Sequence, residues 1–224
     1  MLLFLLHEWL NCFSLHFPTI RVQISLSFSM FSWIIEHTVT ILSLHEGLFT
    51  VQNRFTDILK EGQSISHDGA CMTLTDISPE HYSFFAMEET LRVTNFGTKQ
   101  VWDVFNVERS LQLSDRLDGH LVSGHIDTVG HVRELTKKDD WSLILTVQCD
   151  TLETKFVIHK WSIALNGVSL TVVNTTKNTI TVSLIPLTQE WTNLWKLTLG
   201  QSINIEYDMI AKYVANMIPS SISL

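Results

Sequence analysis

Two stretches of the chain carry the same small polar side chains at the same spacing. The first runs from Ser64 to Thr75 (SISHDGACMTLT), and the second from Ser162 to Val173 (SIALNGVSLTVV). We expect each stretch to be a β-strand, so that Gly69, Cys71 and Thr73 share one face. A thiol and a hydroxyl beside a glycine leave open space with hydrogen-bonding groups, which suits a polar ligand better than a packed core.

The two stretches belong to an internal duplication. A shift of 98 residues pairs Cys71 with Ser169 and, without a gap, continues to pair Glu108 with Glu206. A shift of 91 residues also pairs the starts of the two halves, laying Ser32 on Ser123. The polar face could also be a solvent-exposed strand face without function, but its recurrence in the second half argues against this. We therefore predict two homologous domains of roughly 90 residues each.

Composition limits the class of protein. With 45% hydrophobic and 17% charged residues among 224, the chain is typical of globular proteins. A formal net charge of −8 argues against a nucleic-acid partner. The three cysteines, Cys12, Cys71 and Cys149, show no CxxC spacing, which indicates neither a disulfide framework nor a zinc site. We expect a cytoplasmic protein.

Residues 1–29 are apolar but lack a basic start, and polar residues interrupt them. They fit neither a transmembrane helix nor a signal peptide, so we expect no membrane partner. Our preferred interpretation is an extension upstream of the fold, with Met30 as the natural first residue. The alternative is a membrane-seeking or targeting tail.

Short strands separated by turns predict an all-β fold. A short helix is expected over residues 88–97, closed by Gly97. Residues 207–217 predict a C-terminal amphipathic helix, which either contacts another subunit or packs on its own domain. The expected strands cover residues 38–44, 48–52, 82–87, 101–108, 143–148, 180–185 and 202–206.

His125 is the histidine best placed for acid–base chemistry. If residues 119–127 form a regular strand, it shares a face with Ser123 and Asp127, whereas His120 points to the other side. A single histidine in a strand is more often structural, and nothing local overturns that. The chain has no HExxH, P-loop, GxGxxG or GxSxG motif, so metalloprotease, nucleotide-binding and α/β-hydrolase functions lack support.

From Met30 to about Met217 the chain resembles the alpha-subunit type of riboflavin synthase. The motifs that carry the resemblance are MFSWIIEHT, GQSISHDGACMTLT, MEETLRVTNFG, LDGHLVSGHID, KWSIALNGVSLTVV, SLIPLT and IEYDMIAKY. The resemblance implies two tandem Greek-key six-stranded barrels, residues 30–118 and 119–207, and a C-terminal helix with a tail over 208–224. It also implies a homotrimer, no metal or redox cofactor, and association with lumazine synthase.

The family's reaction moves a four-carbon unit between two molecules of 6,7-dimethyl-8-ribityllumazine, giving riboflavin and a pyrimidinedione. Two related domains would hold two identical substrates. Carried over by motif, the catalytic candidates are Cys71, His125, Ser64 and Thr73. The expected substrate-binding residues are Trp33, Ile34, Ile35, Met72, Met87, Glu89, Thr90, His120, Ser123, Gly124, Lys160, Gly167, Val168, Ser169, Thr171, Ser183, Leu184, Ile185, Pro186, Leu187, Thr188 and Asp208.

Several tryptophans depart from the family pattern. Trp33, Trp161 and Trp195 stand where the family has glycine, and the duplication pairs Trp33, Trp195 and Trp102 with glycines. Trp141 also sits where a turn prefers glycine. One hypothesis is that these are UGA codons translated as tryptophan from an organism that reads UGA as glycine. The alternative is a divergent synthase in which Trp33 blocks its pocket.

Two other functions stay open. A lumazine-binding antenna protein of the same fold would bind one chromophore without chemistry, and retention of Cys71, Ser64 and His125 disfavours it. A flavin-dependent oxidoreductase barrel usually carries an RxYS-type motif, and the chain has none.

Overall fold

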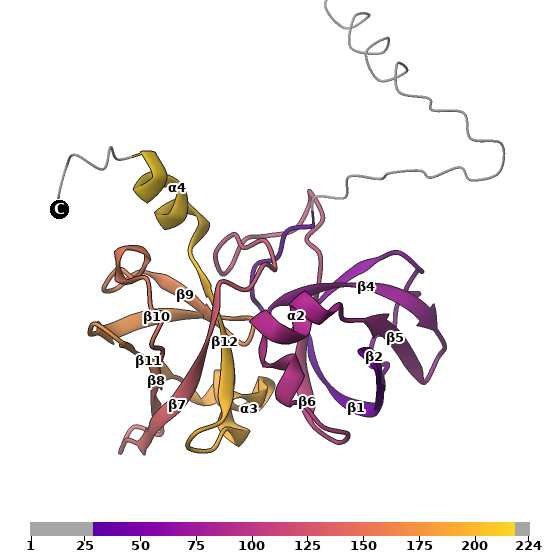
Figure 1. The fold of residues 1–224 in the computed structure, drawn as a ribbon, viewed down its shortest axis with the longest axis horizontal. Helices are drawn as coiled ribbons and strands as arrows, with labels where there is room; N and C mark the ends of the chain where they lie inside the picture. Colours follow the sequence, from indigo (N-terminus) through magenta and orange to yellow (C-terminus); the bar gives the residue numbers. More distant parts are fainter. Residues whose placement is uncertain (1–28, 218–224) are drawn as a thin grey trace, which may run out of the picture.

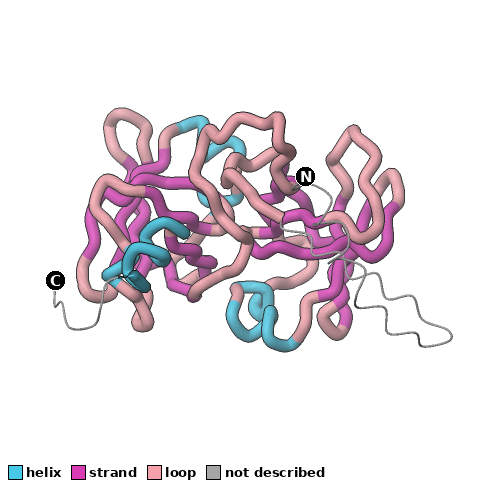
Figure 2. The backbone as a smooth tube through the Cα atoms, turned by 90° about the horizontal axis from the view of Figure 1, so that it is seen from above, coloured by secondary structure: helices cyan, strands magenta, loops and turns pink. Residues whose placement is uncertain are grey.

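Two closed six-stranded barrels lie side by side in the computed structural model, which describes residues 29–217 (Figure 1). Seen from above, they form two strand-rich lobes (Figure 2). The first barrel contains β1 (His37–His45), β2 (Leu48–Gln52), β3 (Ser64–His67), β4 (Ala70–Ile77), β5 (His81–Phe85) and β6 (Val104–Arg109). The second contains β7 (Thr128–Lys137), β8 (Leu143–Gln148), β9 (Ser162–Leu165), β10 (Val168–Thr175), β11 (Thr179–Leu184) and β12 (Ser202–Tyr207).

Both barrels have the same antiparallel topology. The strand order is β1-β2-β5-β4-β3-β6 in the first, and its equivalent in the second. Each barrel carries a short helix followed by a 3-10 turn between its last two strands: α2 (Glu88–Val93) with η1 (Asn95–Thr98), and α3 (Pro186–Trp191) with η3 (Asn193–Lys196). A further turn, η2 (Thr154–Phe156), precedes β9, and α4 (Met209–Met217) ends the described chain. The prediction of two tandem barrels followed by a C-terminal helix is confirmed.

Alternation along β4 and β10 separates a core face from an outward face. Ala70, Met72 and Leu74 are buried in the first barrel, whereas Cys71 is half-buried and Thr73 is exposed. The second barrel repeats this pattern: Val168, Leu170 and Val172 point inward, Ser169 is half-buried and Thr171 is exposed. The predicted polar face exists in both halves.

The repeated stretch is a hairpin rather than one strand. It turns at Asp68–Gly69, with φ angles of 43° and 87°, and at Asn166–Gly167, with 45° and 70°. Two-residue turns with positive φ match the right-handed twist of the flanking strands, and Asx-Gly pairs favour them. Gly69 therefore lies at the turn, and the prediction that it shares the outward face was wrong.

Two other predicted elements differ from the structure. Residues 119–127 form no regular strand, and only an isolated bridge joins Val122 to Phe31. The helix predicted over 88–97 ends at Val93, because Thr94 becomes extended and its side chain accepts a hydrogen bond from Phe96 N–H at the start of η1. Gly97 lies within η1 and does not close the helix.

The two barrels are joined by segments that cross between them, residues 31–35 and 122–126, here called the crossing segments. Ile35 packs into the core of the second barrel, and Ile126 packs against the core of the first. The hairpin turns also meet: a Cβ on Gly69 would lie 2.9 Å from the backbone nitrogen of Gly167. Only glycine allows this approach.

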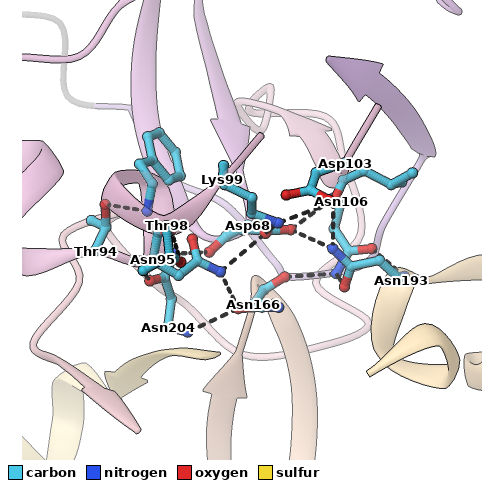
Figure 3. A network of polar contacts seen from close by, with 12 residues as sticks. Asp68, Thr94, Asn95, Thr98, Lys99, Asp103, Asn106, Asn166, Asn193 and Asn204 are labelled. Carbon is cyan, nitrogen blue, oxygen red and sulfur yellow. Dashed lines mark hydrogen bonds and ion pairs between the residues drawn. The ribbon is translucent and has the colours of Figure 1, made fainter. Parts of the chain in front are cut away.

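A buried polar network fills the space beside these turns (Figure 3). Its six residues form three pairs under the 98-residue shift. Two pairs are asparagine with asparagine, and in the third Asp68 stands opposite Asn166. Asn106 Nδ2 donates to Asn193 Oδ1 at 2.9 Å, and Asn193 Nδ2 donates to Asp68 Oδ1 at 2.8 Å. The members are Asp68, Asn95, Asn106, Asn166, Asn193 and Asn204. Because each barrel satisfies polar groups of the other, the network fixes their relative orientation.

Helix α4 follows β12 and projects from the second barrel (Figure 1). Its Ala211 is buried, whereas Ile210, Tyr213, Val214 and Met217 are exposed. The apolar side predicted from sequence is thus uncovered in the single chain. Within residues 29–217 no helix has the length and apolar character needed to cross a membrane. The interpretation of the N-terminal extension lies outside the described residues.

Candidate active site

The first polar face consists of Ser64, Cys71 and Thr73. Ser64 lies opposite Thr73 in the β3–β4 ladder, and the Cys71 thiol is hydrogen-bonded to the side chains of Ser64 and Ser29. Burial raises the pKa of Cys71, while these two hydrogen bonds lower it and the charge of Glu206 raises it further. The thiol is therefore protonated at neutral pH and needs a proton acceptor before it can act as a nucleophile.

The second polar face consists of Ser162, Ser169 and Thr171 at the equivalent positions. His120 Nδ1 shares a hydrogen bond of 2.8 Å with Ser169 Oγ. Burial lowers the pKa of His120, and the charge of Asp208 opposes this. The ring is therefore neutral at pH 7, and a neutral imidazole beside a hydroxyl is suited to accept a proton.

His120 and Ser29 are equivalent under the 91-residue shift. At equivalent positions, Ser29 is therefore hydrogen-bonded to the Cys71 thiol of the first face, and His120 is hydrogen-bonded to the Ser169 hydroxyl of the second. Sequence reasoning gave His120 a secondary place, because it assumed a regular strand over 119–127. Gly119 lets the chain pass: a Cβ there would overlap the carbonyl oxygen of Ser32.

His125 directly follows Gly124 in the crossing segment 122–126, and its side chain is exposed. No hydrogen bond links its ring to another described residue. The backbone nevertheless brings this segment to the first polar face, since Cys71 N–H donates to Gly124 O at 2.9 Å. The equivalent bond, from Ser169 N–H to Trp33 O at 3.1 Å, brings the other crossing segment to the second face.

Two buried glutamates hold the crossing segments. Glu108 Oε1 accepts from Ser32 N–H and Oγ–H at 2.8 and 2.7 Å, and Glu206 Oε1 accepts from the same groups of Ser123, both at 2.9 Å. Burial raises the pKa of each carboxyl to about 7. Sequence reasoning did not assign this role, although the signal was present in the repeated positions of Glu108 and Glu206.

Asp208 and Trp161 border the second face. Trp161 Nε1 donates to Asp208 Oδ2 at 3.0 Å, and Ile210 N–H donates to Asp208 Oδ1 at 2.7 Å at the start of α4. Asp208 is buried, and both of its carboxylate oxygens already accept a hydrogen bond. Lys160, just before it, is exposed.

The other expected binding residues divide by burial. Around the α2 and α3 starts, Met87, Glu89, Ile185, Pro186 and Leu187 are exposed, and Thr90, Thr188 and Ser183 are half-buried. Glu89 is paired with Arg92 at 2.6 Å. Ile34 is exposed, while Trp33 is buried. The side chains of Ile35, Met72, Val168 and Leu184 point into the barrel cores, and Gly167 lies at the turn, so these five can offer a ligand only backbone atoms.

A polar cavity of about 300 Å³ opens elsewhere, between the barrels beside the asparagine network, and Lys99, Asn166 and Asn193 contribute to its lining. None of the residues of the two polar faces lines it, so it does not mark the candidate site. No group of three metal-ligating side chains gathers within residues 29–217.

Comparison with known proteins identifies the family of the sequence. The sequence model of the lumazine binding domain matches residues 32–110 and 123–208. Riboflavin synthase of Escherichia coli (strain K12) is 39% identical over 186 residues, covering 80% of this chain and 87% of that protein. Riboflavin synthase of Bacillus subtilis (strain 168) is 34% identical over 190 residues, with coverage of 83% and 88%.

Solved structures of LumP share the fold. The complex with 6,7-dimethyl-8-(1'-D-ribityl) lumazine has a TM-score of 0.68 at 22% identity and covers 79% of this chain and 98% of LumP. The complex with riboflavin has a TM-score of 0.71 at 20% identity, with coverage of 78% and 97%. With its two lumazine-binding domains and its similarity to synthases along most of its length, the chain belongs to the riboflavin synthase family.

Proposed function

We propose that the protein is a riboflavin synthase, a transferase that converts two molecules of 6,7-dimethyl-8-ribityllumazine into riboflavin and 5-amino-6-ribitylamino-pyrimidinedione. A four-carbon unit leaves one lumazine and joins the other, so atoms balance without an external oxidant or reductant. The observation that carries the proposal is the duplicated polar face. Two equivalent faces, one per barrel, match a reaction that uses two copies of one substrate.

The chemistry needs a proton acceptor, a nucleophile and exact placement of two rings. The 7-methyl protons of the lumazine are acidic, so a neutral imidazole can remove one. We assign Cys71, with Ser64 and Thr73, as the nucleophilic group of the first face and keep His125 as its candidate base. Support for a second acceptor comes from His120, because its ring contacts Ser169 and its pKa is lowered by burial.

The two faces differ in a way that fits different roles for the two substrates. The first carries a thiol at Cys71, and the second carries a hydroxyl at Ser169 with Asp208 nearby. We propose that the first domain (30–118) activates one lumazine and that the second domain (119–207) holds the other. Ser169, Thr171, Thr188 and the backbone at Ile185–Pro186 would contact the second ring.

The assembly is proposed to be a homotrimer in the cytoplasm. The uncovered apolar side of α4 supports a subunit contact, and in the family the first site of one subunit faces the second site of its neighbour. Cys71 and Cys149 are both free thiols, which suits a reducing compartment. Association with lumazine synthase stays a prediction.

The test is incubation of the purified protein with ribityllumazine alone, followed by chromatography of the products. Riboflavin and the pyrimidinedione in equal amounts are expected. A second candidate, a binding protein without chemistry, is favoured by the indole of Trp161 on Asp208. It predicts that ribityllumazine binds and is recovered unchanged, which would contradict the synthase assignment.

A further inference from the structure

Three tryptophans have a left-handed backbone. Trp33, Trp102 and Trp141 have φ angles of 58°, 78° and 65°. In this conformation the Cβ of an L-residue crowds the next carbonyl oxygen, and a bulky side chain is a rare outlier. Tryptophan supplies 7 of the 224 residues, yet it supplies three of the seven non-glycine residues with positive φ in the described chain. Abundance does not explain the association.

The duplication shows which residue these backbones accept. Trp33 corresponds to Gly124 and Trp102 to Gly200, and both glycines have φ of 81°. The turns at Trp102 and Gly200 also share their hydrogen bonds, because each N–H donates to a strand carbonyl of its own barrel, at 2.9 and 2.8 Å. The same turn is thus built once with glycine and once with tryptophan.

Trp141 lies in the hairpin between β7 and β8. Its N–H donates to Lys138 O at 3.1 Å, closing a tight turn. The corresponding hairpin of the first barrel, between β1 and β2, turns at Glu46–Gly47, where the glycine has φ of 83°. The two hairpins differ in length, so Gly47 is not the sequence equivalent of Trp141, but both turns contain a residue with a left-handed backbone.

Packing stabilises two of the three indoles little, because they are exposed. Trp102 and Trp141 are 75% and 72% exposed. Trp33 is 1% exposed and stacks on Phe31, but its buried Nε1–H finds no hydrogen-bond acceptor among residues 29–217. The indole fills a cluster against which Cys71 packs, while the Trp33 carbonyl binds the second polar face. Glycine at position 33 would remove the indole from the cluster beside Cys71 and would keep the backbone bond to Ser169.

Four other non-glycine residues of the described chain also have positive φ. Asp68 and Asn166 belong to a type that tolerates the left-handed region, and Glu46 and Lys160 show that ordinary side chains also occur there. Trp161 and Trp195 have no positive φ, so the backbone singles out three of the tryptophans that the sequence pairs with glycine or places in a turn.

We infer that positions 33, 102 and 141 are glycine positions, and that the functional protein carries glycine at all three because UGA codons there are read as glycine in the cell of origin. One decoding difference accounts for the three sites together. Independent replacements of the smallest residue by the largest would each have to survive the strain of the left-handed backbone.

The direct test combines the three codons with peptide mass spectrometry of the protein purified from its own cells. UGA codons and glycine in all three peptides are expected. A UGG codon at any of the three positions, or a peptide containing tryptophan there, overturns the inference.

Folding of the printed chain gives an independent test that uses neither ligand nor turnover. Trp102→Gly and Trp141→Gly should each raise the thermal midpoint by about 2–4 °C, the shift expected for a small gain in a protein of this size. Trp191→Gly is the matched control, since Trp191 is exposed but lies in α3, where glycine should lower the midpoint. A fall in all three variants would contradict the inference and leave the proposed activity untouched.

Discussion

Lys99 Nζ lies 2.7 Å from Asp68 Oδ2, and the two side chains are only 8% and 0% exposed (Figure 3). In the second barrel, Asn166 stands at the position of Asp68 and Leu197 at the position of Lys99, so both equivalents are uncharged. The pseudo-symmetric network is therefore charged on one side only. Because isolated charges are costly to bury, Asp68 and Lys99 depend on each other.

This dependence predicts a non-additive result. Asp68→Asn or Lys99→Leu alone should each lower the free energy of unfolding by about 3 kcal/mol, because each leaves a buried group without its partner. The double variant, which copies the second barrel, should lie within about 1 kcal/mol of the parent protein. Urea unfolding of all four proteins measures the coupling, with Lys196→Leu as the exposed control. Additive losses would show that the pair is not coupled.

His67 is enclosed in the core of the first barrel, where its Nε2 lies 2.9 Å from the Tyr82 hydroxyl. Burial lowers the pKa of His67 to about 3. The unfolded chain binds a proton near pH 6.5 and the folded chain does not, so stability falls as the pH drops from 6.5 toward 3. At pH 4 the loss from this group should be about 3 kcal/mol.

The second barrel has Leu165 and Ile180 at the positions of His67 and Tyr82. The pair His67→Leu with Tyr82→Phe should therefore remove this acid-dependent term without leaving a buried polar group. Denaturant unfolding at pH 7 and pH 4 tests it, with the exposed His45→Leu as control. The difference between parent and double variant should change with pH; an unchanged difference would contradict the assignment. Glu108 and Glu206, whose raised pKa values act in the opposite direction between pH 4.5 and 7, cancel in this comparison.

The sequence predicts the barrels and the polar faces because both rest on local alternation and on the duplication. Cys71 and Thr73 point outward as expected, and so do Ser169 and Thr171. The Asp68–Gly69 turn also follows from its residue types, although the alternation on either side of it predicts one continuous strand. The crossing segments and the Glu108–Ser32 contact depend on residues 76 positions apart, which no local pattern encodes.

The position of His120 could not be predicted from local sequence either. A regular strand over 119–127 would direct His120 away from the site, whereas the irregular backbone brings it to Ser169. The glycine-like backbones at Trp33 and Trp102 were foreseeable, because the sister residues Gly124 and Gly200 mark the conformation.

The asymmetry of the two faces predicts unequal effects on turnover. Cys71→Ser and His125→Gln should slow riboflavin formation more than Ser169→Ala, because activation is assigned to the first face. Loss of a catalytic acid–base or nucleophilic group typically costs a factor of about 10² to 10⁴. Steady-state kcat of the three variants with ribityllumazine decides the matter. Equal losses would contradict the asymmetric roles but not the family.

His120 and Ser169 are expected to act as a unit. Ser169→Ala and His120→Gln should each reduce kcat, and the double variant should be no slower than the slower single variant, since each removes the same 2.8 Å contact. His120→Gln should also flatten the acid limb of the kcat–pH profile if the imidazole is the proton acceptor. A multiplicative loss in the double variant, with an unchanged pH profile, would show that the two residues act separately.

The uncovered side of α4 makes the oligomer sensitive to single charges. Ile210 and Val214 lie one helical turn apart and are both more than half exposed in the single chain. A carboxylate at either position, in Ile210→Asp or Val214→Asp, should dissociate a trimer that buries this side, because an unpaired charge is costly in an apolar contact. Light scattering on residues 30–224 measures the mass, and Asn216→Asp, an exposed polar position of the same helix, is the matched control. A stable, active monomer in the parent protein would refute the trimer, whereas monomers formed only by the two apolar variants would place α4 in the subunit contact.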